Sequence, residues 1–191
     1  MDIQIREEPI ERLGEHALIV IAFTVERIFV VTTPERGFGG IRLTEAAVEK
    51  PWVKDYDAIK GEGPTRWARR FDVSSWGLIA AYETDRRIGG AVIAFNTAGV
   101  HMLEARTDIA VLWDLRVQPD MRSAGVGSAL FRAAEAWSIR RGCRTLKVET
   151  QNTNVPACRF YAHMGCSLGA MNRFAYPDLA DETQLLWFKQ L

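Results

Sequence analysis

The sequence predicts a mixed α/β fold formed by a single domain, residues 1–191, and three observations support this. Two apolar runs, 76–82 and 88–95, flank a short polar turn, which is the pattern of an antiparallel hairpin. Strand-like segments at 109–117 and 146–150 enclose a long amphipathic helix, which predicts a right-handed crossover and a parallel strand pair. The chain has 191 residues, 48% of them apolar, enough for one packed core. We therefore expect a mostly antiparallel sheet flanked by helices, with one parallel pair.

The first third of the chain has a less regular pattern. Residues 17–23 and 27–32 are dense in Ile, Val and Phe, which favours strands. Residues 34–75 carry more charge and contain two helix-like patches, 43–49 and 65–71, which Pro and Gly residues keep short. We expect this helical excursion to cover the sheet as a substrate lid.

The second half predicts two helices and the closing strands. Apolar residues recur at spacings of three and four between Gly125 and Arg141, and form one stripe of a helix. Asn154 and Pro156 begin a second helix that runs to about His163. Two more strands are expected at 167–176 and 183–188.

Charge and composition exclude several classes of protein. Lys plus Arg and Asp plus Glu both number 24, so the basic excess typical of nucleic-acid binding is missing. No apolar stretch approaches the ~20 residues that cross a bilayer, and the mixed, acidic start does not resemble a secretion signal. The three cysteines, Cys143, Cys158 and Cys166, contain no metal-binding spacing and are expected to be free thiols in a cytoplasmic protein that needs no metal.

The segment that follows the strand at 109–117 is the strongest functional signal. A strand ends, a loop containing Gly125 and Gly127 follows, and a long helix begins. Backbone N–H groups of such a loop, together with the helix dipole, form an anion site, and Arg122 can add a charged contact. The loop has neither the Lys-Ser/Thr of a P-loop nor the spacing of the dinucleotide fingerprint.

Two motifs in this chain occur together in a known family. The first is Arg122-x-x-Gly125-x-Gly127 behind Leu115-Arg-Val-x-Pro119, and the second is Asn154-x-x-Ala157-x-x-Phe160-Tyr161-x-x-x-Gly165. Together they resemble the acetyl-CoA site of the GNAT family of N-acetyltransferases. Further segments, among them Leu112-Trp-Asp-Leu-Arg-Val117 and Val148-Glu-Thr-Gln-Asn-Thr-Asn154, are similar to streptothricin acetyltransferases.

The resemblance implies a sheet in which the parallel strand pair splays to form the acetyl-CoA cleft. It also implies the residues that bind this cosubstrate. They are Leu115, Arg116, Val117, Arg122, Ser123, Ala124, Gly125, Val126, Gly127, Ser128, Asn154, Ala157, Phe160 and Tyr161.

The resemblance further implies direct transfer of acetyl to an amine in a ternary complex. Tyr161 matches the position of the family's general acid, although it could instead pack against Phe160. Asp114 and Glu149 are the candidate acids for the amine. Asp114 could alternatively pair with Arg116 two residues later on the same strand face, and Glu149 could accept hydrogen bonds from the backbone or from Gln151.

The implied acceptor is a small cationic amine such as a streptothricin antibiotic. Two alternatives stay open: the same chemistry on a protein N-terminus, a protein lysine or a polyamine, and an acyl-CoA sensor that does not catalyse. A homodimer is also left open. Trp76, Trp113, Trp187 and Tyr176 could line the acceptor pocket, but aromatic residues more commonly belong to the core.

Overall fold

The computed structural model describes residues 2–179 and 181–191. These form two compact units. The first contains Met1–Ala22, Asp55–Lys147 and Gln190–Leu191, and the second contains Phe23–Lys54 and Val148–Lys189.

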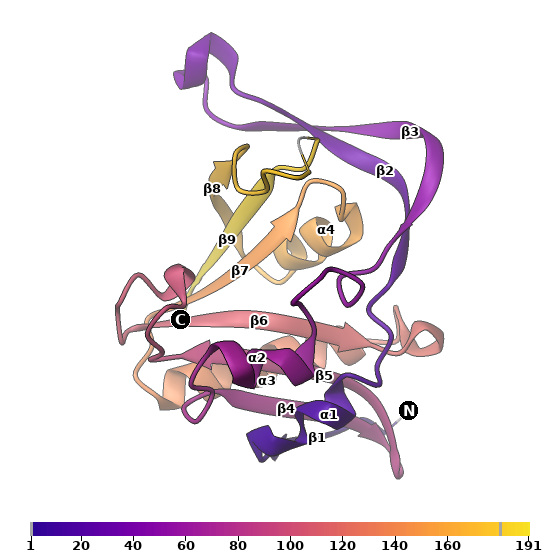
Figure 1. Cartoon of the computed structure of the whole chain (residues 1–191), viewed down its shortest axis with the longest axis vertical. Helices are drawn as coiled ribbons and strands as arrows, with labels where there is room; N and C mark the ends of the chain where they lie inside the picture. Colours follow the sequence, from indigo (N-terminus) through magenta and orange to yellow (C-terminus); the bar gives the residue numbers. More distant parts are fainter. Residues whose placement is uncertain (1, 180) are drawn as a thin grey trace. The chain divides into compact units, whose positions relative to one another are not determined.

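The first unit is an antiparallel sheet with helices on both faces (Figure 1). Its strands are β1 (Gln4–Glu8), β4 (Gly77–Glu83), β5 (Arg86–Phe95) and β6 (Ile109–Val117), paired in that order. Its helices are α1 (Leu13–His16), α2 (Pro64–Arg70) and α3 (Val126–Arg140). Three single turns of 3₁₀ helix, Ile10–Arg12, His101–Leu103 and Pro119–Met121, connect these elements.

Glycines in the central strands allow the helices to approach the sheet closely. A Cβ at Gly77 would overlap the Trp137 ring of α3, and a Cβ at Gly90 would overlap the imidazole of His16 in α1. The two glycines therefore admit a bulky ring where any other residue would force it away.

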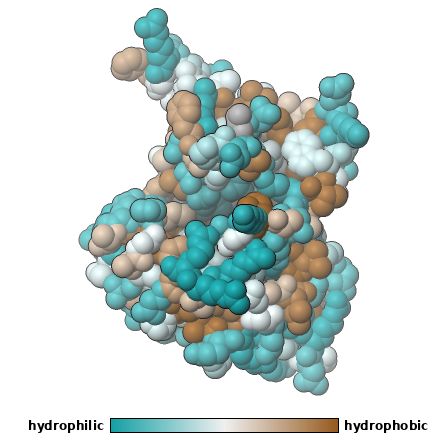
Figure 2. All heavy atoms as spheres, viewed as in Figure 1, coloured by the Kyte–Doolittle hydropathy of each residue, from teal (hydrophilic) through white to brown (hydrophobic). Residues whose placement is uncertain are grey.

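Helix α2 is amphipathic. Trp67 is buried against Trp76 and Trp113, with ring centroids 6.5 and 6.3 Å away. The opposite side carries exposed arginines, and Figure 2 shows hydrophilic side chains gathered over this helix. The pattern at 65–71 thus predicted a helix correctly.

The second unit contains a long hairpin and the end of the main sheet. Strands β2 (Phe23–Thr32) and β3 (Arg42–Lys54) form an antiparallel ribbon, with the 3₁₀ segment Pro34–Gly37 between them. The other elements are β7 (Thr145–Gln151, which begins in the first unit), α4 (Val155–His163), β8 (Ser167–Asn172) and β9 (Gln184–Gln190).

The strand order of the main sheet is β1-β4-β5-β6-β7-β9-β8. Strands β6 and β7 form the parallel pair, and the remaining pairs are antiparallel. The predicted fold class is therefore confirmed. The expected hairpin, the crossover helix α3 and the helix α4 also lie within a few residues of their predicted bounds.

The strand expected at 17–23 is wrong. Helix α1 ends at His16, and β2 begins only at Phe23. Arginine side chains bind the backbone carbonyls of the intervening segment: Arg116 donates to Ile19 O at 3.3 Å, and Arg122 to Val20 O and Ala22 O at 3.1 and 3.2 Å. Guanidinium groups thus satisfy acceptors that a neighbouring strand would otherwise satisfy.

The helix expected at 43–49 is also wrong, because these residues lie in β3. Val31 pairs with Leu43 and Arg27 with Ala47, so pairing with β2 overrides the local helical preference. Of the excursion at 34–75, only α2 is an α-helix among the described residues. Strand β1 was not predicted, because its polar, exposed residues resemble a loop.

Candidate functional site

Helix α3 begins with N–H groups that no side chain in the described part of the protein caps. Its N-cap, Gly125, has φ +87°, and the first turn contains no acidic residue. The first N–H groups of a helix lack intrahelical partners and, with the helix dipole, attract anions. A Cβ at Gly125 would meet nothing within 4 Å, so the glycine is required for its backbone conformation rather than for space. This N-terminus, with Val126, Gly127 and Ser128 in its first turn, fits a phosphate-containing group.

Arg122, expected to contact that anion, supports the chain around the site. Its Nε donates to Val117 O at 3.3 Å, and its Nη2 to the two carbonyls of the 17–22 segment described above. The side chain is exposed, and the adjacent Ser123 has φ +64°. A contact between Arg122 and an anion would therefore add to these bonds or exchange with them.

Strand β6 has a bulge directly before the residues expected to bind the cosubstrate. Leu112 pairs with Ile93 and Asp114 with Val92, which leaves Trp113 as the extra residue. Bulges bend a strand and increase its twist. Leu115, Arg116 and Val117, whose backbone groups are the predicted contacts, follow the bulge.

Asp114 is paired with Arg116, as one of the two sequence interpretations expected. The Arg116 Nε lies 2.9 Å from Asp114 Oδ1, and its Nη2 lies 3.0 Å from Asp114 Oδ2. His16 Nε2 is a second partner, 2.9 Å from Asp114 Oδ1. Arg116 also donates to both oxygens of Asp57, at 2.6 and 2.8 Å.

Burial and charge act in opposite directions on this cluster. Burial raises the pKa of Asp114, but the hydrogen bond and charge of His16 and the charge of Arg116 outweigh it, so the pKa lies below its usual value. Burial lowers the pKa of Arg116, but its two carboxylate partners raise it by more, so the pKa lies above its usual value. The Asp114 charge is therefore compensated within the protein.

Glu149, in the second unit, has different partners. Tyr176 donates its hydroxyl to Glu149 Oε1 at 2.6 Å, and Gln184 donates its amide to Oε2 at 2.7 Å. The expected partner Gln151 donates to Glu149 Oε1 over a longer distance, 3.4 Å, and also donates to the Tyr176 oxygen at 2.8 Å. In the described residues no Lys, Arg or His forms an ion pair with this half-buried carboxylate.

Helix α4 carries the second group of predicted residues. Asn154 is its N-cap and accepts from Ala157 N at 3.1 Å, so this residue has a structural role. Tyr161 is buried, and its ring lies edge-on to Phe160 with centroids 5.1 Å apart. This ring contact agrees with the packing interpretation of Tyr161, and the catalytic role of Tyr161 stays a prediction.

The tryptophans proposed for an acceptor pocket belong to the core, apart from the half-buried Trp113. Trp76 and Trp113 pack with centroids 5.3 Å apart, in the same cluster as Trp67 and Phe71. Trp187 is buried, and its indole donates to Thr150 Oγ1 at 2.8 Å. Of the four aromatic candidates, Tyr176 is the one that contacts a predicted catalytic acid.

The three cysteines are free and buried, as expected. Burial raises the pKa of the Cys158 thiol to about 11 and that of Cys143 above its usual value. Nucleophilic thiolates are therefore disfavoured at neutral pH.

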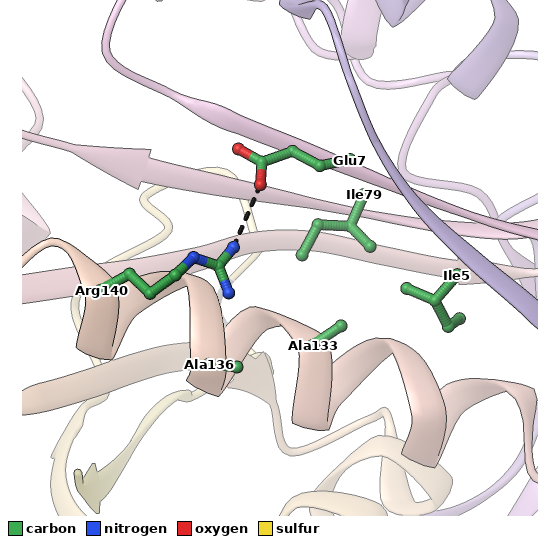
Figure 3. A pocket seen from close by; sticks show the side chains of 6 residues that line it. All are labelled: Ile5, Glu7, Ile79, Ala133, Ala136 and Arg140. Atoms are coloured by element: carbon green, nitrogen blue, oxygen red, sulfur yellow. Dashed lines mark hydrogen bonds and ion pairs between the residues drawn. The ribbon is translucent and has the colours of Figure 1, made fainter.

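A pocket of about 240 Å³ lies between β1 and α3 (Figure 3). It is lined by Ile5, Glu7, Ile79, Ala133, Ala136 and Arg140. The charge of Glu7 is compensated by Arg140, 3.1 Å away. Residues 2–179 and 181–191 include no group of three or more His, Cys, Asp or Glu suited to a metal ion and no helix long and apolar enough to cross a membrane.

Sequence reasoning missed the partners that set the two acids apart. His16 and Asp57 are distant in sequence from Asp114, and Gln184 is distant from Glu149. The Asp114–Arg116 pair was predictable because residues i and i+2 share a strand face. Contacts across 35 or 98 positions have no such local signal.

Comparison with known proteins agrees with the resemblance. The Acetyltransferase (GNAT) family model matches residues 43–166. A streptothricin acetyltransferase A of Bacillus subtilis (strain 168) is 35% identical over 147 residues, covering 76% of this chain and 77% of the relative. A streptothricin acetyltransferase of Escherichia coli is 25% identical over 170 residues, covering 87% of this chain and 84% of the relative.

Solved structures share the fold. A nourseothricin acetyltransferase superposes with a TM-score of 0.75 and 22% identity, covering 100% of this chain and 99% of the other. A Bacillus anthracis (strain Ames) protein in complex with acetyl coenzyme A has a TM-score of 0.76 and 23% identity, covering 100% and 98%. With a family model that matches well over half of its length, the chain belongs to the acetyltransferase (GNAT) family.

Proposed function

We propose that this protein transfers the acetyl group of acetyl-CoA to a primary amine of a small cationic molecule of the streptothricin class. The proposed binding of acetyl-CoA rests on the N-terminus of α3, where the N–H groups that follow Gly125 have no side-chain cap among the described residues. The choice of acceptor is supported by the relatives named streptothricin acetyltransferase.

The binding of the donor is assigned to two segments of the first unit. The N–H groups of Val126, Gly127 and Ser128 would bind the pyrophosphate, supported by the loop residues 122–124. Backbone groups of residues 115–117, after the bulge in β6, would bind the amide-containing arm of the cosubstrate. Bound acetyl-CoA supplies an activated thioester.

The chemistry requires a neutral amine, a polarised carbonyl and a proton for the leaving sulfur. The amine nitrogen would form a bond to the carbonyl carbon while the carbon–sulfur bond breaks. Tyr161 would hold the proton that the departing sulfur accepts, as the match to the family motif implies. Buried cysteines with raised pKa values favour this direct attack over an acyl-enzyme.

Of the two candidate acids, Glu149 is the better binding group for the amine. Asp114 already has Arg116 and His16 as partners, so an added cation would gain little there. Glu149 has neutral hydrogen-bond donors. We assign Asp114 to holding β6 and Glu149 to binding the cationic acceptor and relaying its proton through water.

Three free buried thiols are also consistent with a reducing cytoplasmic setting. The homodimer that the sequence left open is tested by measuring the native mass in solution. We infer no further partner.

The decisive experiment is a panel of amines with acetyl-CoA, read by release of the CoA thiol. We expect streptothricin to exceed polyamines, peptide N-termini and peptide lysines in kcat/KM. Tyr161→Phe should lower turnover about 100-fold while acetyl-CoA still raises the Tm. Unchanged turnover would refute the acid assignment, and no turnover with any amine would favour the sensor.

The donor site has a matched pair of variants. Gly125→Val should abolish the rise in Tm that acetyl-CoA produces. Valine rarely adopts the φ of +87° found at this position, so the loop would lose the backbone conformation that presents its N–H groups. Gly99→Val is the control, since Gly99 also has a positive φ, +82°, with nothing within 4 Å of an added Cβ. The control should lose similar stability and keep the response to acetyl-CoA.

A further inference from the structure

Glu149 is surrounded by three polar side chains from three segments of the second unit. Gln151 is the last residue of β7, Tyr176 follows β8, and Gln184 is the first residue of β9. Each carboxylate oxygen receives one close hydrogen bond, from Tyr176 at 2.6 Å and from Gln184 at 2.7 Å. The orientation of the carboxylate is therefore fixed from two sides.

The direction of these hydrogen bonds follows from the chemistry of the groups. An ionised carboxylate only accepts, so Gln184 must present its amide N–H₂ to Glu149. The Gln151 amide donates to the Tyr176 oxygen, which leaves the phenolic proton for Glu149. Gln151 thus directs Tyr176, and Tyr176 directs the carboxylate.

Described residues before and after Tyr176 are bonded to other segments of the second unit. On one side Arg173 donates to Val31 O at 2.9 Å. On the other, Glu182 pairs with Lys54 at 2.5 Å, and Thr183 N donates to Asn152 Oδ1 at 2.7 Å. A tyrosine held in this way can position a partner with little loss of its own freedom.

The donors to Glu149 are neutral, so they orient the negative charge without cancelling it. A half-buried charge acts on a cation more strongly than a charge in bulk water does. Glu149 therefore combines a fixed direction with a charge that no Lys, Arg or His of the described residues pairs with, an arrangement suited to an ammonium group.

We propose that Tyr176 and Gln184 are positioning residues that fix the Glu149 carboxylate to bind the ammonium group of the acceptor. This rests on the proposed function, in which Glu149 binds the amine. The two side chains act through Glu149, so their loss weakens acceptor binding while donor binding stays unchanged.

The test uses Tyr176→Phe, which removes one hydroxyl and keeps the ring. We expect the KM for streptothricin to rise about tenfold, the effect of a hydrogen bond to a charged group, with kcat within about threefold. The KM for acetyl-CoA should not change. Gln184→Met should shift the same KM in the same direction.

The matched control is Tyr82→Phe. Tyr82 also donates its hydroxyl to a glutamate, Glu8 Oε1 at 2.8 Å, but it lies on β4 in the first unit. Its loss should leave both KM values unchanged. Equal KM effects in the two tyrosine variants would overturn the proposal.

A double-mutant cycle separates this inference from the proposed function. If Tyr176 acts through Glu149, Tyr176→Phe should change the streptothricin KM less than twofold in a Glu149→Gln background. A rise in KM with Glu149→Gln but none with Tyr176→Phe overturns the positioning role alone. No rise with Glu149→Gln overturns the role of Glu149 in the proposed function.

Discussion

Asp114 and Glu149 are both acids in strands of the main sheet, yet their surroundings are opposite. Asp114 lies in a cluster of alternating charge, with Arg116 between it and Asp57 and with His16 as a further partner. Glu149 receives hydrogen bonds from neutral groups. The first arrangement compensates the carboxylate charge with cationic side chains, and the second orients the carboxylate without a cationic partner among the described residues. The partners of an acid, more than its position in a motif, indicate which role it has.

The largest effect that tests this comparison is expected from Arg116→Met. The Arg116 side chain is 1% exposed, and its loss leaves the buried Asp114 and the adjacent Asp57 without their shared cation. Breaking a buried pair in this way costs about 3–5 kcal/mol. Urea denaturation followed by circular dichroism measures it, and a loss below about 1 kcal/mol would contradict the structural role of the cluster.

Glu149→Gln should give the opposite profile. The amide keeps an acceptor for the Tyr176 hydroxyl, so we expect the free energy of unfolding to change by less than about 1 kcal/mol. Under the proposed function the kcat/KM for streptothricin should fall at least about tenfold, because the carboxylate charge proposed to bind the amine is gone. A loss of stability as large as that of Arg116→Met would remove the contrast between the two acids.

The pH dependence of the unfolding free energy tests the cluster around Asp114 next. The folded-state pKa of Asp114 lies below its unfolded value of about 3.9, because His16 and Arg116 outweigh the effect of burial. Its contribution is therefore complete above about pH 4 and is lost as the pH falls through the folded-state value. Asp114→Asn should flatten the acid side of a plot of unfolding free energy against pH. If the unfolding free energy of the variant falls at acidic pH as steeply as that of the wild type, groups other than Asp114 determine the loss of stability there.

The smallest effect is expected from Arg86→Gln. Arg86 pairs with Asp120 at 2.8 Å, but both side chains are more than half exposed. Exposed pairs contribute about 0–1 kcal/mol, and salt screens them. Thermal denaturation at low and high salt should detect little change. A loss comparable to that of Arg116→Met would show that pairing, rather than burial, sets the energy.

The sequence predicted the parts of the fold that local patterns determine. The β4–β5 hairpin, strand β6 and helix α3 have strong periodicity and clear turn residues, and their bounds were nearly correct. The errors occurred where distant partners decide. Pairing with β2 makes residues 43–49 a strand, and arginine donors replace a strand partner along 17–22.

In the candidate site, too, short-range features were predicted and features that depend on distant partners were not. The α3 N-terminus and the Asp114–Arg116 pair were visible as short-range patterns. The surroundings of Glu149 were not, because Tyr176 and Gln184 lie 27 and 35 residues away in the chain. Which acid retains its charge therefore depends on tertiary contacts that spacing alone does not reveal.

The small strand β1 has a practical consequence for anyone who shortens this chain. The family match begins only at residue 43, but residues 4–8 pair with β4 along its outer edge. A protein trimmed to the matched segment would expose a row of unpaired N–H and C=O groups, the kind of edge that recruits other chains into aggregates. It would also lose His16 and leave a void over Gly90. Poor solubility of such a fragment would reflect an uncovered edge, not a defective active site.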